Sequence, residues 1–350
     1  TGKGNYGQAI DLSVSGADLA GFHALVATAR IETDKPVVQG SINYTYGRLP
    51  FDVGASVFRT VAPRGGYAVN GQERILAEET VGATTSATFY RNRAYASQTL
   101  SVSYSLARRG ADFPDARAEL NPYDAPQRFP RGTLGLLGLS YSFSNAESRL
   151  WSVSPEKGIN FSVSSNLSDP ALASQYRGVN TTANLTGYIP MPWLRHHVLA
   201  LHGGAGLAVG DYPGRGAFYV GGFTDVPFYQ SIQKSIVQGG IVLRGYDPVV
   251  VYGSQYALAN AEYRFPILNI DRGLSTLPLF INRISGNLFF DYGSAFDDVR
   301  GAKLKSGTGA EAWFDVILGY NLAMTFRLGY ARGLASLGKD QVYFLAVAPY

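Results

Sequence analysis

Apolar and polar residues alternate along most of the chain. In one example, Leu100, Val102 and Leu106 would lie on one side of an extended strand, while Ser101 and Ser103 would lie on the other. A strand that crosses a lipid bilayer needs this pattern over about nine to eleven residues, because its outer side contacts hydrocarbon. The alternation therefore predicts strands that are apolar toward lipid and small or polar toward a lumen.

About fifteen segments share this pattern and together cover most of the chain. They lie near residues 7–15, 22–31, 36–47, 51–61, 77–90, 95–108, 132–145, 157–168, 175–188, 196–209, 254–265, 285–294, 309–319, 321–332 and 341–349. Some joins are tight, at 47–50 and 319–321, whereas 109–131 and 210–253 are long and polar. Bacterial barrels combine short turns at one end with long loops at the other, and single-chain barrels have an even number of strands. We therefore expect one barrel domain over residues 1–350 with sixteen strands, one of them unrecognised or upstream.

A soluble β-sandwich or propeller also has alternating strands, but three features disfavour it. The outward faces stay apolar on nearly every segment, and the segments exceed the five or six residues usual for soluble strands. Aromatic residues recur near strand ends, as a membrane-interface girdle requires. They include Tyr44, Tyr46, Phe89, Tyr90, Tyr141, Phe143, Tyr263 and Phe265. No apolar run approaches the roughly 18–20 residues of a membrane helix. The predicted fold is an all-β, transmembrane antiparallel barrel of a bacterial outer membrane.

Composition narrows the functional classes. Charged residues make up 16% of the chain, below the roughly 25% of soluble domains, and cysteine is absent. The net charge of +4 is spread without a basic run, so no nucleic-acid partner is expected, and membrane lipid or lipopolysaccharide would be a sufficient partner. The sequence contains no nucleophile elbow and no metal-ligand cluster, so we expect neither an enzyme nor a cofactor.

Two short motifs stand out from the alternating pattern. Leu243, Arg244, Gly245 and Tyr246 form an L-R-G-Y sequence in the longest loop. A later strand reads Phe289-x-Asp291-x-Gly293, and these three residues share its inward face. Between the two motifs, residues 259–266 read A-N-A-E-Y-R-F-P, with Glu262 on the inward face.

In that order, the three motifs resemble those of the BamA/TamA (Omp-eighty-five) superfamily, which includes FhaC-type secretion pores. The resemblance covers roughly the last 150 residues, and the first half is similar only in its strand pattern. It implies that the long loop folds back into the lumen, where Arg244 would pair with Glu262 and Asp291. Gly245 would allow a tight turn, Tyr246 would pack against the barrel interior, and the arrangement would stabilise the barrel.

The C-terminal strand carries a weaker signal. Phe344 and Tyr350 would share a face, and a terminal aromatic residue is typical of the recognition signal for barrel insertion. Pro349 cannot donate a ladder hydrogen bond. It would either weaken a seam between the first and last strands or mark the chain end. The family's periplasmic POTRA modules are not expected here, because the strand pattern begins near residue 7.

Three functions are compatible with these observations. The resemblance implies a barrel that assists insertion, assembly or translocation of outer-membrane proteins, with unfolded clients and accessory lipoproteins as partners. A transport or secretion pore gated by the long loop is an alternative. A membrane anchor for an appended soluble domain is the third. The sequence leaves the choice among them open.

Overall fold

A computed structural model describes residues 2–3, 7–33, 38–69, 72–111, 132–149, 151–223, 242–273, 275–319 and 321–347. Its strands and short helical turns are β1 (Gly2–Lys3), β2 (Gln8–Ala17), β3 (His23–Glu32), β4 (Val38–Tyr46), β5 (Asp52–Val69), β6 (Gln72–Arg93), β7 (Ala96–Ala111), β8 (Gly132–Ser144), β9 (Gly158–Ser168), η1 (Pro170–Leu172), β10 (Gly178–Pro190), β11 (Val198–Gly210), α2 (Tyr212–Arg215), β12 (Phe218–Val220), β13 (Val251–Gly253), β14 (Gln255–Gly273), β15 (Leu279–Phe296), η2 (Val299–Gly301), β16 (Lys305–Leu318), β17 (Leu322–Gly333) and β18 (Asp340–Val347). No helix within these residues is long and apolar enough to cross a membrane.

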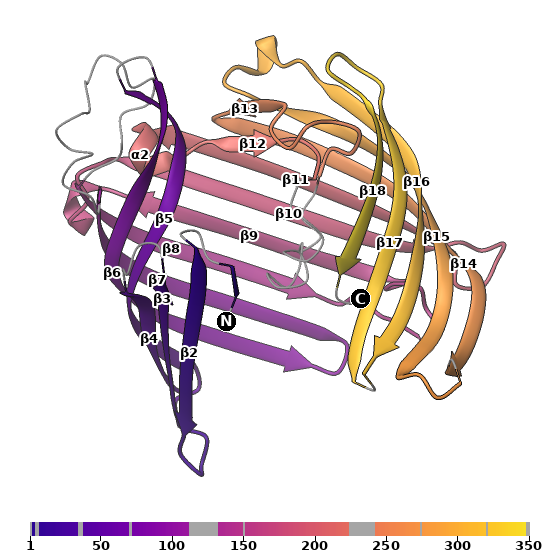
Figure 1. Ribbon diagram of the computed structural model, residues 1–350, viewed down its shortest axis with the longest axis horizontal. Helices are drawn as coiled ribbons and strands as arrows, with labels where there is room; N and C mark the ends of the chain where they lie inside the picture. Colours follow the sequence, from indigo (N-terminus) through magenta and orange to yellow (C-terminus); the bar gives the residue numbers. More distant parts are fainter. Residues whose placement is uncertain are drawn as a thin grey trace.

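The chain folds as one antiparallel meander that curls into a barrel (Figure 1). Each strand from β1 to β11 pairs with the next, β11 pairs with β14, and the order continues to β18. Every one of the fifteen predicted segments corresponds to a long strand of this sheet. The two-residue β1 pairs with β2 and makes the sheet sixteen-stranded. The sequence therefore predicted the fold class, and within the described residues the sheet consists of fifteen long strands and the two-residue β1.

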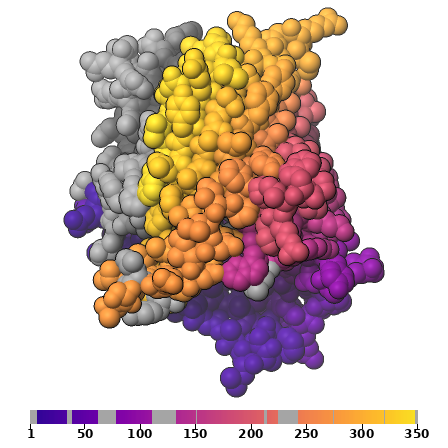
Figure 2. Space-filling model, turned by 90° about the vertical axis from the view of Figure 1, so that its right-hand side faces the viewer, coloured from indigo at the N-terminus to yellow at the C-terminus, as the bar shows by residue number. Residues whose placement is uncertain are grey.

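Polarity is inverted relative to a soluble protein. Large apolar side chains such as Leu139, Leu185 and Leu288 are exposed on the outer face. The residues that the sheet encloses include charged and amide side chains, among them fully buried Asp291 and Asn287. Such a surface is stable only where hydrocarbon replaces water on the outside. From the side, β14 to β18 form one continuous outer face, orange to yellow (Figure 2).

The aromatic residues form a girdle at the short-turn end. His23 lies 5.0 Å from Tyr46 between ring centroids, and Phe51 lies 4.7 Å from Phe89. Farther around the sheet, the rings of His197, Tyr263 and Phe265 pack against one another, and Trp193 Nε1 donates to the Tyr263 hydroxyl at 3.2 Å. Aromatic rings with a polar edge favour the membrane interface, so this ring of side chains marks one edge of the bilayer.

Several strands are longer than the alternation predicts. The hairpin of β5 and β6 was expected to occupy residues 51–61 and 77–90, but its pairing continues to Val69 and Gln72. Backbone pairing needs no apolar side chain once a strand has left the lipid, so the alternation stops while the ladder goes on. The extension projects from the end of the barrel that carries the long loops.

The sheet has two edges within the described residues. No ladder pair there joins β18 to β1 or β2. Almost every side chain of β2 is exposed, and β18 has eight residues, fewer than any other long strand. In Figure 1, β2 and β18 lie at opposite sides of the opening that faces the viewer. The first and last strands are therefore where the barrel wall is weakest.

The inversion of polarity predicts different effects for two neighbouring substitutions on β8. Leu139→Arg would place a charge against lipid and cost about 2–4 kcal/mol of unfolding free energy near the bilayer midplane. Ser140→Arg would place the same charge at nearly the same depth on the lumen side, where it stays hydrated, and should cost less than about 1 kcal/mol. Urea unfolding in lipid vesicles measures both values. Equal costs would contradict the assignment of the two faces.

Candidate functional site

The loop between β11 and β14 returns to the inner wall of the barrel. Its base is the short hairpin of β12 and β13, which pairs Phe218 with Gly253. Above this hairpin, Gly222 donates its N–H to the carbonyl of Asp247, and Leu243 donates to the carbonyl of Gly221. These bonds hold the L-R-G-Y sequence in a compact turn. Residues 224–241 of the predicted loop lie outside the described residues.

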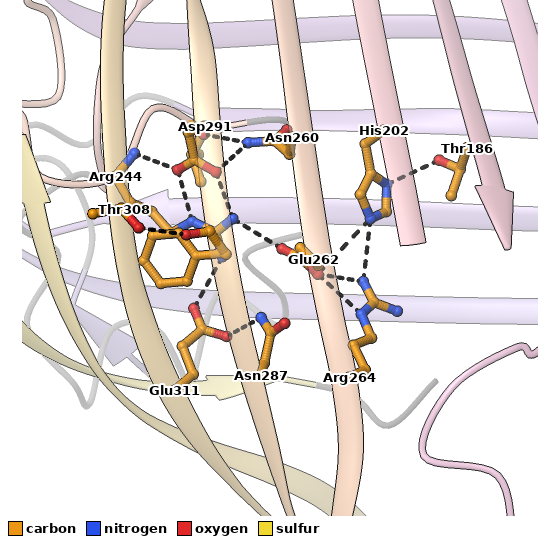
Figure 3. A network of polar contacts seen from close by, with 12 residues as sticks. Thr186, His202, Arg244, Asn260, Glu262, Arg264, Asn287, Asp291, Thr308 and Glu311 are labelled. Carbon is orange, nitrogen blue, oxygen red and sulfur yellow. Dashed lines mark hydrogen bonds and ion pairs between the residues drawn. The ribbon is translucent and has the colours of Figure 1, made fainter. Parts of the chain in front are cut away.

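Arg244 lies in the centre of this site, with 4% of its side chain exposed. Its Nε donates to Asp291 Oδ2 at 2.8 Å and its Nη2 donates to Oδ1 at 2.6 Å (Figure 3). The backbone N–H of Arg244 also donates to Asp291 Oδ2, at 2.9 Å. A planar guanidinium meets a carboxylate with two parallel bonds, which a lysine cannot do.

Two further carboxylates from neighbouring strands complete the ring around Arg244. Nη2 lies 2.9 Å from Glu262 Oε1 of β14, and Nη1 donates to Glu311 Oε1 of β16 at 3.2 Å. The guanidinium carbon lies 3.5 Å from the centroid of the Phe289 ring, so the cation also stacks on an aromatic face. We call Arg244, Glu262, Phe289, Asp291 and Glu311 the clasp. It ties the loop to three adjacent strands.

The clasp continues into a polar network along the wall. Asn260 donates to Asp291 Oδ1 at 2.6 Å and to the carbonyl of Val242 at 3.2 Å. Arg264 donates to Glu262 Oε2 through Nε and Nη2, at 2.9 and 2.6 Å. Beyond it, His202 Nε2 lies 3.2 Å from Arg264 Nη2 (Figure 3). Each carboxylate therefore has directed partners, which offsets the cost of removing its charge from water.

The charge of Arg244 is secured by its surroundings. Burial by itself would lower the pKa of this guanidinium, but the hydrogen bonds and charges of Asp291, Glu262 and Glu311 outweigh that effect and hold the pKa well above its ordinary value. A permanently charged group enclosed by carboxylates therefore attaches the loop firmly to the barrel wall.

The other residues of L-R-G-Y serve close packing. Gly245 has φ of +83°, and a Cβ there would lie 2.4 Å from the backbone nitrogen of Gly333. Only glycine fits this conformation and this approach. Leu243 and Tyr246 are fully buried in one apolar cluster, and the Tyr246 hydroxyl donates to the carbonyl of Ser306 at 2.8 Å. The turn is therefore held by shape as well as by charge.

Gly293 completes the F-x-D-x-G motif for a steric reason. It pairs with Leu258 in the β14–β15 ladder, and a Cβ at this position would lie 2.2 Å from the carbonyl oxygen of Ala257. A side chain would push β15 away from β14 beside Asp291. The structure thus brings Arg244, Glu262, Phe289 and Asp291 into contact, while Gly293 shapes the strand that presents them.

Glu311 is a member of the clasp that the sequence motifs did not indicate. Its Oε1 accepts from the Tyr343 hydroxyl at 2.5 Å, and its Oε2 accepts from Trp313 Nε1 at 2.7 Å and Asn287 Nδ2 at 3.1 Å. The available signal was alternation, which places Glu311 on the inward face of the strand that follows Asp291; in the ladder it lies opposite Asn287. No motif marks it, so alternation alone could not rank it above other lumen residues.

The predicted C-terminal signal is only partly within the described residues. Phe344 lies on the outer face of β18, and its ring centroid is 5.7 Å from that of Phe326. Pro349 and Tyr350 lie outside the described residues. Their predicted roles at the seam stay predictions.

Comparison with known sequences identifies the family. The Omp85 superfamily domain matches residues 25–335, which is most of the chain. The chain belongs to the Omp85 superfamily. Barrels of the Omp85 superfamily are bacterial outer-membrane proteins. No curated protein sequence is similar enough to match.

Solved structures with the same fold include two kinds of Omp85 barrel. BamA from Haemophilus ducreyi, in a form lacking POTRA domains 1–3, is 15% identical with a TM-score of 0.62, over 99% of this chain and 68% of that chain. CdiB from Escherichia coli is 11% identical with a TM-score of 0.55, over 98% and 61%. CdiB from Acinetobacter baumannii is 12% identical with a TM-score of 0.53, over 99% and 57%. This Omp85 chain thus spans about three fifths of either CdiB chain.

The network around Arg244 consists of ion pairs between protein groups. Across the described part of the chain, no group of three or more His, Cys, Asp or Glu side chains could hold a metal ion. The three carboxylates of the clasp instead face the guanidinium and its donor neighbours.

Arg244→Ala should destabilise the folded barrel. Removing the guanidinium leaves Asp291 buried without its cation, while Glu262 keeps Arg264, and the loss costs about 3–5 kcal/mol. Arg244→Lys should cost less, because it keeps the charge and loses the paired hydrogen bonds. The temperature of the heat-induced mobility shift on semi-native gels reports both changes.

Arg30→Ala is the matched control for that measurement. Arg30 forms a similar two-bond pair with Asp11, but 45% of its side chain is exposed. Exposed pairs contribute about 0–1 kcal/mol, so this variant should behave almost as the parent. If Arg244→Ala shifted no more than Arg30→Ala, the clasp would not stabilise the barrel.

Proposed function

We propose that this Omp85 barrel assists the insertion and assembly of outer-membrane proteins. The observation that carries the proposal is that, within the described residues, no ladder pair joins β18 to β1 or β2, which leaves the sheet with free edges there. An edge strand offers a row of free backbone N–H and C=O groups, and an incoming strand can pair with them. Unfolded outer-membrane proteins are the clients, and accessory lipoproteins and outer-membrane lipid are the expected partners.

The clasp supports this role because it reaches the last strand. Tyr343 of β18 donates to Glu311, and its ring lies 4.7 Å from the Phe223 ring of the loop, measured between centroids. The last strand is thus bonded to the same carboxylate that binds Arg244. A loop fixed in the lumen holds the inner side of β18 while the outer edge stays free. We infer that the clasp positions the template edge and takes no chemical part in insertion.

A second candidate function is translocation of a polypeptide through the lumen. The wall of β6 to β10 carries hydroxyl groups that bond to one another, such as Thr84 with Ser105 at 3.0 Å and Ser164 with Thr182 at 3.0 Å. A stretch of wall lined by such neutral groups would let an extended chain pass without binding it. A large rise of conductance in planar bilayers on deletion of residues 211–250 would favour this candidate over the first.

Joining the two edges should stop client insertion. The chain contains no cysteine, and Leu12 on β2 and Val342 on β18 are both exposed, so Leu12→Cys and Val342→Cys give two attachment points for a bifunctional maleimide of sufficient length. The bridge would deny a client strand access to the edge. In vesicles carrying the purified barrel, the folding rate of a client protein should fall to that of empty vesicles.

Tyr330→Cys with Val342→Cys is the control for the bridge. These two positions already face each other in the β17–β18 ladder, so a bridge there locks a pair that is closed in any case. This variant should keep the client folding rate of the unbridged protein. An unchanged rate of client folding with the β2–β18 bridged protein would contradict the proposed insertion mechanism.

A further inference from the structure

The turn between β8 and β9 is buried at its tip, although it belongs to the short-turn end of the barrel. A bridge between Glu147 and Lys157 closes the base of the turn. Beyond it, Ser152, Val153 and Ser154 are all buried, and Val153 is 2% exposed. A turn that projected freely would expose its tip. We call residues 151–156 the latch.

The latch is held from across the barrel. Nη1 of Arg283, on β15, donates to the carbonyl oxygen of Ser152. In the sheet, β10, β11 and β14 separate β9 from β15, so this contact cannot arise along the wall. Arg283 is itself paired with Asp315 of β16, at 2.5 Å. Asp315 shares the inward face of its strand with buried Glu311, so the latch crosses the inside of the barrel.

The latch is also fixed from its own side. Glu156 is buried and accepts a hydrogen bond from the Ser152 hydroxyl at 2.8 Å. His196, in the turn between β10 and β11, lies with Nδ1 at 2.6 Å from Glu156 Oε1. The backbone N–H of Arg149 donates to the Ser152 hydroxyl at 2.7 Å. The carboxylate of Glu156 therefore shapes the tip and attaches it to the neighbouring turn.

The contacts of the latch lead to the last strand. Thr325 of β17 donates its hydroxyl to Asp315 at 2.5 Å, and it is fully covered. In the β17–β18 ladder Thr325 pairs with Val347, the final described pair at the short-turn end. A docked latch thus fixes Arg283 and Asp315, and Asp315 fixes the residue that pairs with the end of β18.

We infer that residues 151–156 form a latch that closes the short-turn mouth of the lumen and braces the short-turn end of β17 and β18. Short turns face the periplasm in bacterial barrels, so the latch lies on the side from which unfolded chains arrive. When Arg283 releases Ser152, the mouth of the lumen opens and the last strand loosens at the same time. The clasp enters from the opposite end and binds the same wall. The latch does not depend on which cargo the barrel handles.

Cysteine labelling tests whether the latch closes the mouth. In this cysteine-free chain, Val153→Cys should react with a polar maleimide on the order of tenfold more slowly than Trp151→Cys, because position 151 is 43% exposed and position 153 is covered. Adding Arg283→Ala should remove most of that difference. Arg177→Ala, at an arginine 74% exposed, should leave it unchanged.

Two results would overturn the latch. One is equal labelling of the two cysteines in the parent protein, and the other is an Arg283→Ala variant in which position 153 stays protected.

Hydrogen exchange tests the link between the latch and the last strand without any introduced cysteine. Arg283→Ala should raise the exchange rate of amides in residues 340–347 several-fold, and Arg177→Ala should not. Unchanged exchange in β18 would refute the link between latch and seam. Neither readout uses client insertion, so failure here is separable from failure of the proposed function.

Discussion

A single arginine, buried inside the barrel and enclosed by carboxylates from three strands, determines how the rest of this structure is arranged. Arg244 stays charged there because Asp291, Glu262 and Glu311 all face it. That arrangement fixes the inward register of β14, β15 and β16. It also brings the long loop back to the wall, and with it Tyr343 of the last strand.

The barrel wall consequently has two chemically different halves. The charged groups that bind the loop and the latch lie on β14 to β16, and the clasp and the latch contact them from opposite ends of the barrel. The wall of β6 to β10 carries hydroxyl groups that hydrogen-bond to one another. The inserted segments therefore stiffen the wall next to β18 and leave the other edge of the sheet, at β1 and β2, without such support. Edge strands with no partner are where a new strand can pair.

Sequence periodicity was sufficient for the fold, because a strand in lipid must alternate and each of the fifteen long strands does. It also placed Glu262 and Asp291 on the inward face, and the family resemblance supplied their partner Arg244. The role of Glu311 was not predicted, because this residue lies in no motif. The outer ends of β5 and β6 were not predicted, because strand pairing outside the lipid leaves no alternating pattern in the sequence. The contact of Ser152 with Arg283 joins residues far apart in sequence, and neither has a local signature.

A double-mutant cycle between Arg244 and Asp291 tests the central claim most directly. The unfolding free energy in lipid vesicles would be measured for the parent, Arg244→Ala, Asp291→Ala and the double variant. If the two side chains depend on each other, the double variant should lose about 2–3 kcal/mol less than the sum of the single losses, since either change alone leaves the other group without its partner. Losses that add to within about 0.5 kcal/mol would show that the clasp does not hold the barrel together.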